Sequence, residues 1–300
     1  MKILVTGSTG LLGRALVARL APYGDVVGLS RHPPTPAPAY RHLTCDLTDA
    51  DATRAAVRRV DPEVVIHAQA MTDVDRCEQE PHEAQRMNLR TVEHLCDALR
   101  LRSVLLLILS SDQVFDGTLG RPYTEDDAPN PINVYGASKR AAEEVALRYP
   151  TGVVIRTGPL FGPGRKTFCD TMVERAARGE RTEVFLDQTT SPTYTEDLAE
   201  GISWLLQTLI ADPDHAWPRI YHVVNAGACR RVEFARRLLE LLGYSERLLV
   251  PIRMAEQQHP ARRPAFAGLT SRYVQTITGR TLRAWDDALQ AYLQHHHSRN

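Results

Sequence analysis

A tyrosine and a lysine stand four residues apart in the segment NVYGASKR, residues 133–140. Positions i and i+4 share one face of a helix, so the Lys139 ammonium is expected on the same side as the Tyr135 phenol. The pKa of a free tyrosine is about 10, and a nearby cation lowers it. The spacing therefore favours a tuned proton donor, although an ordinary helix start, capped by Asn133, has the same pattern.

A glycine-rich segment, VTGSTGLLG, follows the first predicted strand (residues 2–6) and leads into a helix. Its spacing is G-x-x-G-x-x-G. Glycine permits the tight turn, lets the backbone approach a pyrophosphate and lets the helix pack close to the strand. In this strand–turn–helix context the segment predicts a dinucleotide site. The residues expected to contact the cofactor are Gly7, Thr9, Gly10, Leu11, Leu12 and Gly13.

The end of the second predicted strand (residues 25–30) bears on the choice of cofactor. Sites that prefer NAD often place a carboxylate there, whereas this chain has Ser30 and Arg31. An arginine can pair with a 2′-phosphate, which favours NADP(H) and leaves NAD(H) possible. A solvated loop arginine is the plainer interpretation. Further on, Asp46 and Leu47 follow a short strand, where the carboxylate can accept from an adenine amino group or cap the next turn.

These groups need a scaffold, and the chain alternates between apolar runs and helical segments. The strands are predicted at residues 2–6, 25–30, 62–68, 104–109 and 152–157, with Thr48 as a helix N-cap and one helical face over 80–101. This alternation predicts a doubly wound, Rossmann-type α/β fold with a parallel sheet. We expect a dinucleotide-binding domain at 1–158. Residues 159–300 are expected to form mainly a smaller α/β substrate-binding lobe, with some segments returning to the first domain.

The composition of the chain indicates which classes of binding partner to expect. Basic and acidic side chains both number 36, so a nucleic-acid binder is not expected. The longest apolar run, VLLLIL, is too short to cross a bilayer, and the strand-like N-terminus does not resemble a signal peptide. Five scattered cysteines without a CxxC pair predict reduced thiols and a cytoplasmic location. The tail HHHSRN, with His295, His296 and His297, is expected to be a disordered end and not a metal site, because a structural site needs further ligands at defined spacing. The expected partner is a small molecule, and a homodimer is compatible with the sequence.

Three motifs together resemble an extended short-chain dehydrogenase/reductase: TGxxGxxG, SSDQVFDG at 110–117 and YGASK at 135–139. More narrowly, residues 67–88, NPINVYGASK, DQTTSPTYTEDLA and RRPAFAGL resemble the dTDP-4-dehydrorhamnose reductase family, in the same order over nearly the whole chain. The resemblance implies reduction of a 4-keto nucleotide sugar. NADPH would give the hydride and Tyr135 the proton, Lys139 would lower the tyrosine pKa, and Ser111 would orient the carbonyl.

The same resemblance implies further contacts. Those with the cofactor are Ala68, Gln69, Ala70, Asn88 and Ser110, together with Tyr135 and Lys139. Those with the substrate are Thr72, Asp73, Asp75, Asp112, Gln113, Pro159 and Arg263. Thr72, Asp73 and Asp75 are equally suited to helix capping, and Asn88 to an ordinary place in a helix.

The chain departs from the family pattern at three positions. Ser111 replaces a threonine, Gln113 a tyrosine and Pro159 a tryptophan, so two aromatic residues on which a sugar ring could pack are missing. A different sugar or ketone is therefore compatible with the sequence. So is an NADP-binding regulatory subunit, similar to the β subunit of methionine adenosyltransferase. A nucleotide-sugar epimerase or dehydratase is a third possibility, but dehydratases use an Asp–Glu pair where this chain has Asp112 and Gln113.

Overall fold

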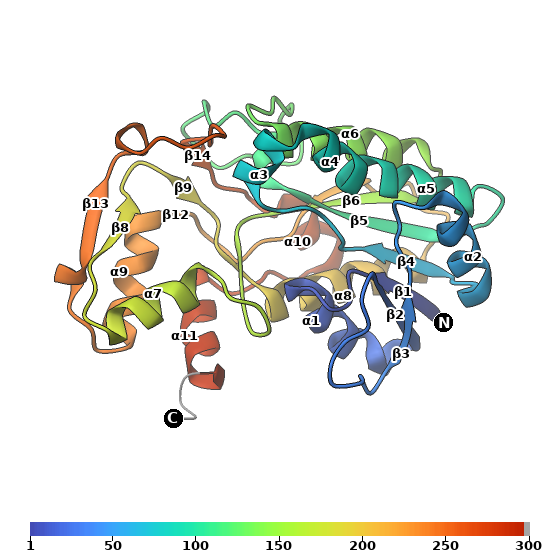
Figure 1. The fold of residues 1–300 in the computed structure, drawn as a ribbon. Helices are drawn as coiled ribbons and strands as arrows, with labels where there is room; N and C mark the ends of the chain where they lie inside the picture. Colours follow the sequence, from blue (N-terminus) through green and yellow to red (C-terminus); the bar gives the residue numbers. More distant parts are fainter. Residues whose placement is uncertain (297–300) are drawn as a thin grey trace.

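A parallel seven-stranded sheet forms the centre of the protein in the computed structural model, which describes residues 1–296 (Figure 1). The strand order is β3-β2-β1-β4-β5-β6-β11, which extends the order of a dinucleotide-binding sheet by one strand. The predicted doubly wound α/β fold is confirmed. The strands are β1 (Lys2–Thr6), β2 (Asp25–Ser30), β3 (Arg41–Thr44), β4 (Val64–His67), β5 (Leu105–Ser111), β6 (Gly152–Thr157) and β11 (Ile220–His222).

Helices cover both faces of this sheet, which is why its inner strands are mostly apolar. One face is covered by α2 (Ala50–Val60), α5 (Thr91–Leu99) and α6 (Val134–Arg148). The other is covered by α1 (Leu11–Leu20), α8 (Thr195–Ala211) and α10 (Arg272–Thr278). Each layer has its own apolar core, so the loops at the strand ends project from a rigid base.

Two local predictions differ from the structure. The N-cap of α2 is Asp49, whose carboxylate accepts from the Ala52 amide, and not Thr48, whose backbone and hydroxyl both donate to Asp46. The helical face over 80–101 is divided into α4 (Pro81–Gln85), the π-helical turn η2 (Arg86–Arg90) and α5. A π-helical turn inserts a residue and often marks a functional region.

The second lobe lies beyond the carboxyl ends of the sheet strands, at the left of Figure 1. Its core joins Phe161, Tyr194, Phe234 and Tyr292, whose rings pack against one another. The helices are α7 (Phe168–Ala177), α9 (Arg231–Leu241) and α11 (Trp285–His296). The short strands are β7 (Leu160–Phe161), β8 (Thr182–Phe185), β9 (Thr189–Thr190), β10 (Thr193–Tyr194), β12 (Cys229–Arg230), β13 (Leu249–Ile252) and β14 (Phe266–Ala267).

The chain after residue 158 contributes to both lobes. Strand β11 pairs with β6 in the central sheet, and α8 packs on α1. The exact boundary at 158 stays a prediction. Residues 297–300 of the HHHSRN tail lie outside the described residues. Within residues 1–296, no helix combines the length and apolar composition of a membrane span.

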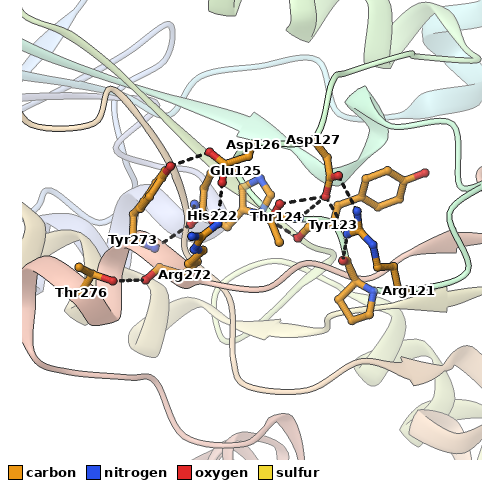
Figure 2. A network of polar contacts seen from close by, with 11 residues as sticks. Arg121, Tyr123, Thr124, Glu125, Asp126, Asp127, His222, Arg272, Tyr273 and Thr276 are labelled. Carbon is orange, nitrogen blue, oxygen red and sulfur yellow. Dashed lines mark hydrogen bonds and ion pairs between the residues drawn. The ribbon is translucent and has the colours of Figure 1, made fainter.

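Polar residues between Arg121 and Asp127, on the connection between β5 and α6, form hydrogen bonds and ion pairs with β11 and α10 (Figure 2). Glu125 Oε1 accepts from the His222 amide at 3.1 Å and from the Tyr273 amide at 3.3 Å. The Asp126 carboxylate accepts from Arg272 at 2.7 Å and from the Tyr273 hydroxyl at 2.6 Å. The network therefore links the β5–α6 connection to β11 and α10. The remaining short elements are α3 (Val74–Gln79), η1 (Ala21–Tyr23), η3 (Asp112–Val114), η4 (Glu246–Leu248) and η5 (Met254–Glu256).

Candidate active site

A cavity of about 870 Å³ lies at the carboxyl ends of the central strands and extends to residues of the second lobe. This is the edge at which ligands bind in open α/β sheets. The cavity collects most of the residues singled out in the sequence. They are Gly7, Thr9, Gly10, Leu11, Leu12, Gly13, Ser30, Arg31, Ala68, Gln69, Ala70, Thr72, Ser110, Ser111, Asp112, Gln113, Tyr135, Lys139, Pro159 and Arg263.

The glycine-rich turn is built so that backbone lines the cavity. Gly7 has φ +68°, and a Cβ there would lie 2.9 Å from the Gln69 amide nitrogen. A Cβ on Gly13 would lie 2.0 Å from the Gly7 carbonyl oxygen, so α1 can begin only if this residue is glycine. Gly10 is the N-cap of α1 and offers no side-chain acceptor to the first amides of the helix. Those amides are therefore suited to an anionic ligand such as a phosphate.

The end of β2 presents basic side chains to the cavity. The Ser30 hydroxyl donates to the His32 carbonyl at 2.7 Å and contacts His42 Nε2 at 2.7 Å, which fixes the turn. Arg31 and His32 line the cavity beside it. Among the described residues, Asp112 is the single carboxylate that lines the cavity, whereas five lining residues are arginine or lysine. The cavity therefore has the charge of a site for phosphorylated ligands.

Tyr135 and Lys139 are both buried in the wall of the cavity, with exposed fractions of 8% and 2%. Helix α6 begins as predicted, because the Asn133 side chain accepts from the Gly136 amide at 2.7 Å. Burial raises the pKa of Tyr135, a hydrogen bond with Ser111 lowers it, and the Asp112 carboxylate raises it. The net direction is upward, opposite to the lowering expected from Lys139, because desolvation of the phenolate dominates. Burial also lowers the pKa of Lys139 to about 8, while Glu143 raises it.

Ser111 and Asp112 form a pair at the end of β5. The Ser111 hydroxyl donates to Asp112 Oδ1 at 2.8 Å and accepts from the Gln113 amide at 3.2 Å. Asp112 is 2% exposed, and its Oδ2 has no hydrogen-bond partner among residues 1–296. Burial raises the pKa of Asp112 to about 6. A bound molecule with a donor group can satisfy this oxygen, because an unpaired buried polar atom is costly.

Five of the predicted site residues do not line the cavity: Asp46, Leu47, Asp73, Asp75 and Asn88. Asp46 accepts from Thr48, and Asp73 accepts from the Arg76 amide as the N-cap of α3. Leu47 is buried in the apolar layer beneath α2. For Asp46 and Asp73 the structure therefore shows the capping contacts that the sequence left open.

Asn88 does not line the cavity but hydrogen-bonds to segments that do. It lies in the π-helical turn, where its Oδ1 accepts from the Met71 amide at 2.7 Å and its Nδ2 donates to the Met71 carbonyl at 3.1 Å. The same Nδ2 donates to the Ser138 hydroxyl, which in turn donates to the Tyr135 carbonyl. Asn88 thus ties the loop after β4 to the helix that carries Tyr135.

Asp75 joins the two lobes. Its carboxylate accepts two hydrogen bonds from the Arg263 guanidinium, at 2.9 and 2.6 Å, and one from the Ala261 amide at 3.1 Å. The hydrogen bond from Arg263 is the main cause that lowers the pKa of Asp75 to about 2. Arg263 and the neighbouring His259 line the cavity, so this ion pair positions its outer wall.

Twelve residues that line the cavity were not predicted from the sequence, and half of them come from the chain after residue 158. Arg231 begins α9, and its guanidinium lies over the Phe168 ring at 4.0 Å. Phe185 and His259 meet edge to face, with ring centroids 5.5 Å apart. Paired arginines before the helical run of α9 were the available signal for Arg231. The missed lining residues are His32, Val74, Met87, Leu109, Thr157, Gly158, Leu160, Arg165, Phe185, Gln188, Arg231 and His259.

Comparisons with known proteins agree on one family. The model of the RmlD substrate binding domain matches residues 1–298. The chain is 36% identical to a dTDP-4-dehydrorhamnose reductase of Streptomyces griseus, over 95% of this chain and 91% of that one. It is 33% identical to the spore coat polysaccharide biosynthesis protein SpsK of Bacillus subtilis, over 98% and 97%. Its fold is similar to a Bacillus anthracis dTDP-4-dehydrorhamnose reductase solved with NADP, at TM-score 0.87 and 27% identity, over 98% and 100%.

Proposed function

Because the chain belongs to the RmlD substrate binding domain family, we propose that it reduces the ketone of a 4-keto nucleotide sugar. The chain is an NAD(P)-dependent reductase of the extended short-chain type. The observation that supports the proposal best is one cavity that holds a glycine-rich helix start, Ser111, Tyr135 and Lys139. A hydride donor, a proton donor and a group that orients the carbonyl are what a ketone reduction needs.

NADP(H) is the cofactor that fits the residues present. The open amides at the start of α1 suit a pyrophosphate, and Arg31 suits a 2′-phosphate. The similar Bacillus anthracis enzyme was solved with NADP. When bound, the reduced cofactor supplies the hydride. Lys139, which lines the cavity, would donate to the nicotinamide ribose.

Tyr135 holds the proton that the ketone oxygen receives. Its raised pKa keeps the phenol protonated at neutral pH, which is the form that a proton donor requires. Ser111 orients the carbonyl through its hydroxyl. When the proton leaves Tyr135 Oη, a protonated Lys139 on the same helix face stabilises the phenolate.

The substrate proposed is a nucleoside diphosphate sugar. Arg165, Arg231 and Arg263 line the part of the cavity formed by residues after 158, and their charge suits a diphosphate. The sugar itself would lie near Gln113 and Pro159, which stand where the family has aromatic residues. We therefore propose that the preferred sugar differs in substituents from that of the typical reductase, while the 4-keto group is the same.

The test is NADPH oxidation with a panel of dTDP- and UDP-linked 4-keto sugars. Tyr135→Phe is expected to abolish turnover and to leave the Kd for NADPH within a few-fold, because the phenol ring still fills its site. Normal turnover in this variant would sink the assignment of the proton donor. No oxidation of NADPH with any sugar of the panel would contradict the proposed function itself.

A further inference from the structure

Lysine is rare in this chain, and one of the few is buried. Of the 36 basic residues only Lys2, Lys139 and Lys166 are lysines. Lys139 is 2% exposed, whereas Lys166 is an exposed partner of Glu174. A buried ammonium loses its hydration and tends to give up its proton unless an opposite charge is close. The charge of Lys139 therefore depends on what surrounds it.

Glu143 lies one helical turn after Lys139 on α6 and is fully buried. Its Oε1 accepts from the Ser110 hydroxyl at 2.6 Å and from Arg156 Nε at 2.8 Å. Its Oε2 accepts from Arg156 Nη2 at 2.8 Å and from Arg140 Nη1 at 3.3 Å. Ser110 lines the cavity, but neither Glu143 nor Arg156 does. The carboxylate thus lies behind the cavity wall, between the helix and the sheet.

The positions of these groups follow from the sheet register. Arg156 on β6 is the register partner of Ser110 on β5 and of His222 on β11. The three side chains therefore form a row across adjacent strands, and Glu143 on α6 contacts the first two. Residue Ser110 is followed directly by Ser111, so Glu143 holds the end of β5 at the point where the chain enters the cavity.

Glu143 supplies the negative charge that balances Arg140 and Arg156 between α6 and the sheet. Cations surround it, and burial holds the neighbouring imidazoles of His67 and His222 neutral, with pKa values of about 3. The groups near Lys139 and Glu143 are His67 of β4, Arg156 of β6, His222 of β11, Arg140 of α6, and Tyr135 and Asp112 at the cavity. In a low dielectric, neutralising Glu143 removes the anion that lies one helical turn from Lys139 and leaves Arg140 and Arg156 without the carboxylate they share.

A gain in stability does not by itself explain why Glu143 and Arg156 form a buried ion pair. Apolar residues of the same volume often stabilise a core as well as a buried ion pair does. Resting on the reaction proposed above, we propose that Glu143 is a positioning residue whose buried negative charge keeps Lys139 protonated at neutral pH and whose bond from Ser110 fixes the serine pair at the strand end. In agreement with this geometry, Glu143 raises the pKa of Lys139 against the effect of burial.

The scarcity of lysine makes a direct test possible. In protein labelled with 13C and 15N only at lysine, three side chains give signals, and Lys139 is assigned with Lys139→Arg. We expect Glu143→Gln to lower the pKa of Lys139 by about one unit or more. Glu144→Gln is the matched control, because Glu144 is the adjacent residue, also pairs with Arg140 and is half-exposed. It is expected to leave the titration of Lys139 unchanged.

A second variant covers the case in which Glu143→Gln does not fold. Arg140 is partly exposed, so Arg140→Gln is expected to fold and to raise the pKa of Lys139, because it removes a cation beside Glu143. An unchanged Lys139 titration in folded Glu143→Gln overturns the proposal, as does an equal shift in Glu144→Gln. If Glu143→Gln is unfolded, an unchanged or lowered Lys139 pKa in Arg140→Gln overturns it.

The pH profile of the turnover rate tests whether the charge of Lys139 matters for the reaction. The rate in wild type is expected to fall as Lys139 loses its proton above about pH 8. In Glu143→Gln this alkaline limb moves to lower pH by the same shift that the lysine signal shows. A uniform loss of rate at every pH would indicate a structural role only and overturn the proposal. The lysine titration needs no substrate, so a failure of the proposed function leaves that result interpretable.

Discussion

Asp112 and Glu125 are two buried carboxyl groups on the same connection between β5 and α6, and burial raises the pKa of both. Each also has one carboxylate oxygen for which the described part of the chain offers no hydrogen-bond partner. Asp112 lines the cavity and accepts from Ser111. Glu125 lies in the network of Figure 2, no residue of which lines the cavity, and it accepts backbone amides from β11 and α10. A raised pKa therefore marks burial, and only the surroundings distinguish a site residue from a structural one.

The largest loss of activity is expected from a substitution of Asp112 in the cavity. Asp112→Asn keeps the shape of the side chain but removes the charged acceptor of the Ser111 hydroxyl. We expect kcat/KM to fall about 100-fold, equivalent to about 2.7 kcal/mol, with no loss of thermal stability because a buried charge disappears. Steady-state kinetics and Tm measure the two quantities. Wild-type kinetics in this variant would place Asp112 with Glu125, as a structural residue.

In the network of Figure 2, a substitution is expected to lower the stability of the protein and to leave its activity nearly unchanged. Glu125→Ala leaves the amides of His222 and Tyr273 without their acceptor and opens a cavity, so the free energy of unfolding should fall by about 2–3 kcal/mol. Turnover of the folded variant should stay within about twofold, because its contacts do not reach the cavity. Urea unfolding and kcat/KM test both parts. A large loss of activity in a stable variant would show that the network controls the site.

The raised pKa of Asp112 predicts how the stability of the protein changes with pH. The pKa of Asp112 is about 6 in the folded protein and about 3.9 when unfolded, so between these values the folded state binds more protons. This group therefore stabilises the fold as pH falls from about 7 to about 4, by about 2 kcal/mol. Asp112→Asn should lose that contribution. Urea unfolding of both proteins at pH 4.5 and pH 7 measures it, and equal pH dependence would contradict the raised pKa.

The smallest effect is expected at the rim of the network. Asp126 pairs with Arg272, and both side chains are more than half exposed. Asp126→Asn should lower the free energy of unfolding by less than about 1 kcal/mol, because exposed ion pairs contribute little. The same urea measurement applies, with Glu125→Ala as the reference. An effect as large as that of Glu125→Ala would mean that the exposed bonds, and not the buried acceptor, hold the connection.

Much of the first lobe was predictable because its signals are local. Continuous apolar runs predicted the parallel strands, and Gly7 and Gly13 predicted the first turn, since a Cβ at either would collide with backbone. Asn133 was predicted to cap the helix of Tyr135 and does so. The cap of α2 was misplaced by one residue, because Thr48 and Asp49 are both good N-caps and the sequence does not rank them.

The order of the elements and the chemical groups at the strand ends could be read from the amino-acid sequence, because strand and helix periods and turn residues act over a few positions. Which of these groups meet depends on how the elements pack. Asp75 and Arg263 pair across 188 positions, and Ser110, Glu143 and Arg156 come together through strand register. The packing also determines the direction of each pKa, raised for Tyr135 and lowered for Lys139, because desolvation depends on what the whole fold packs around a group.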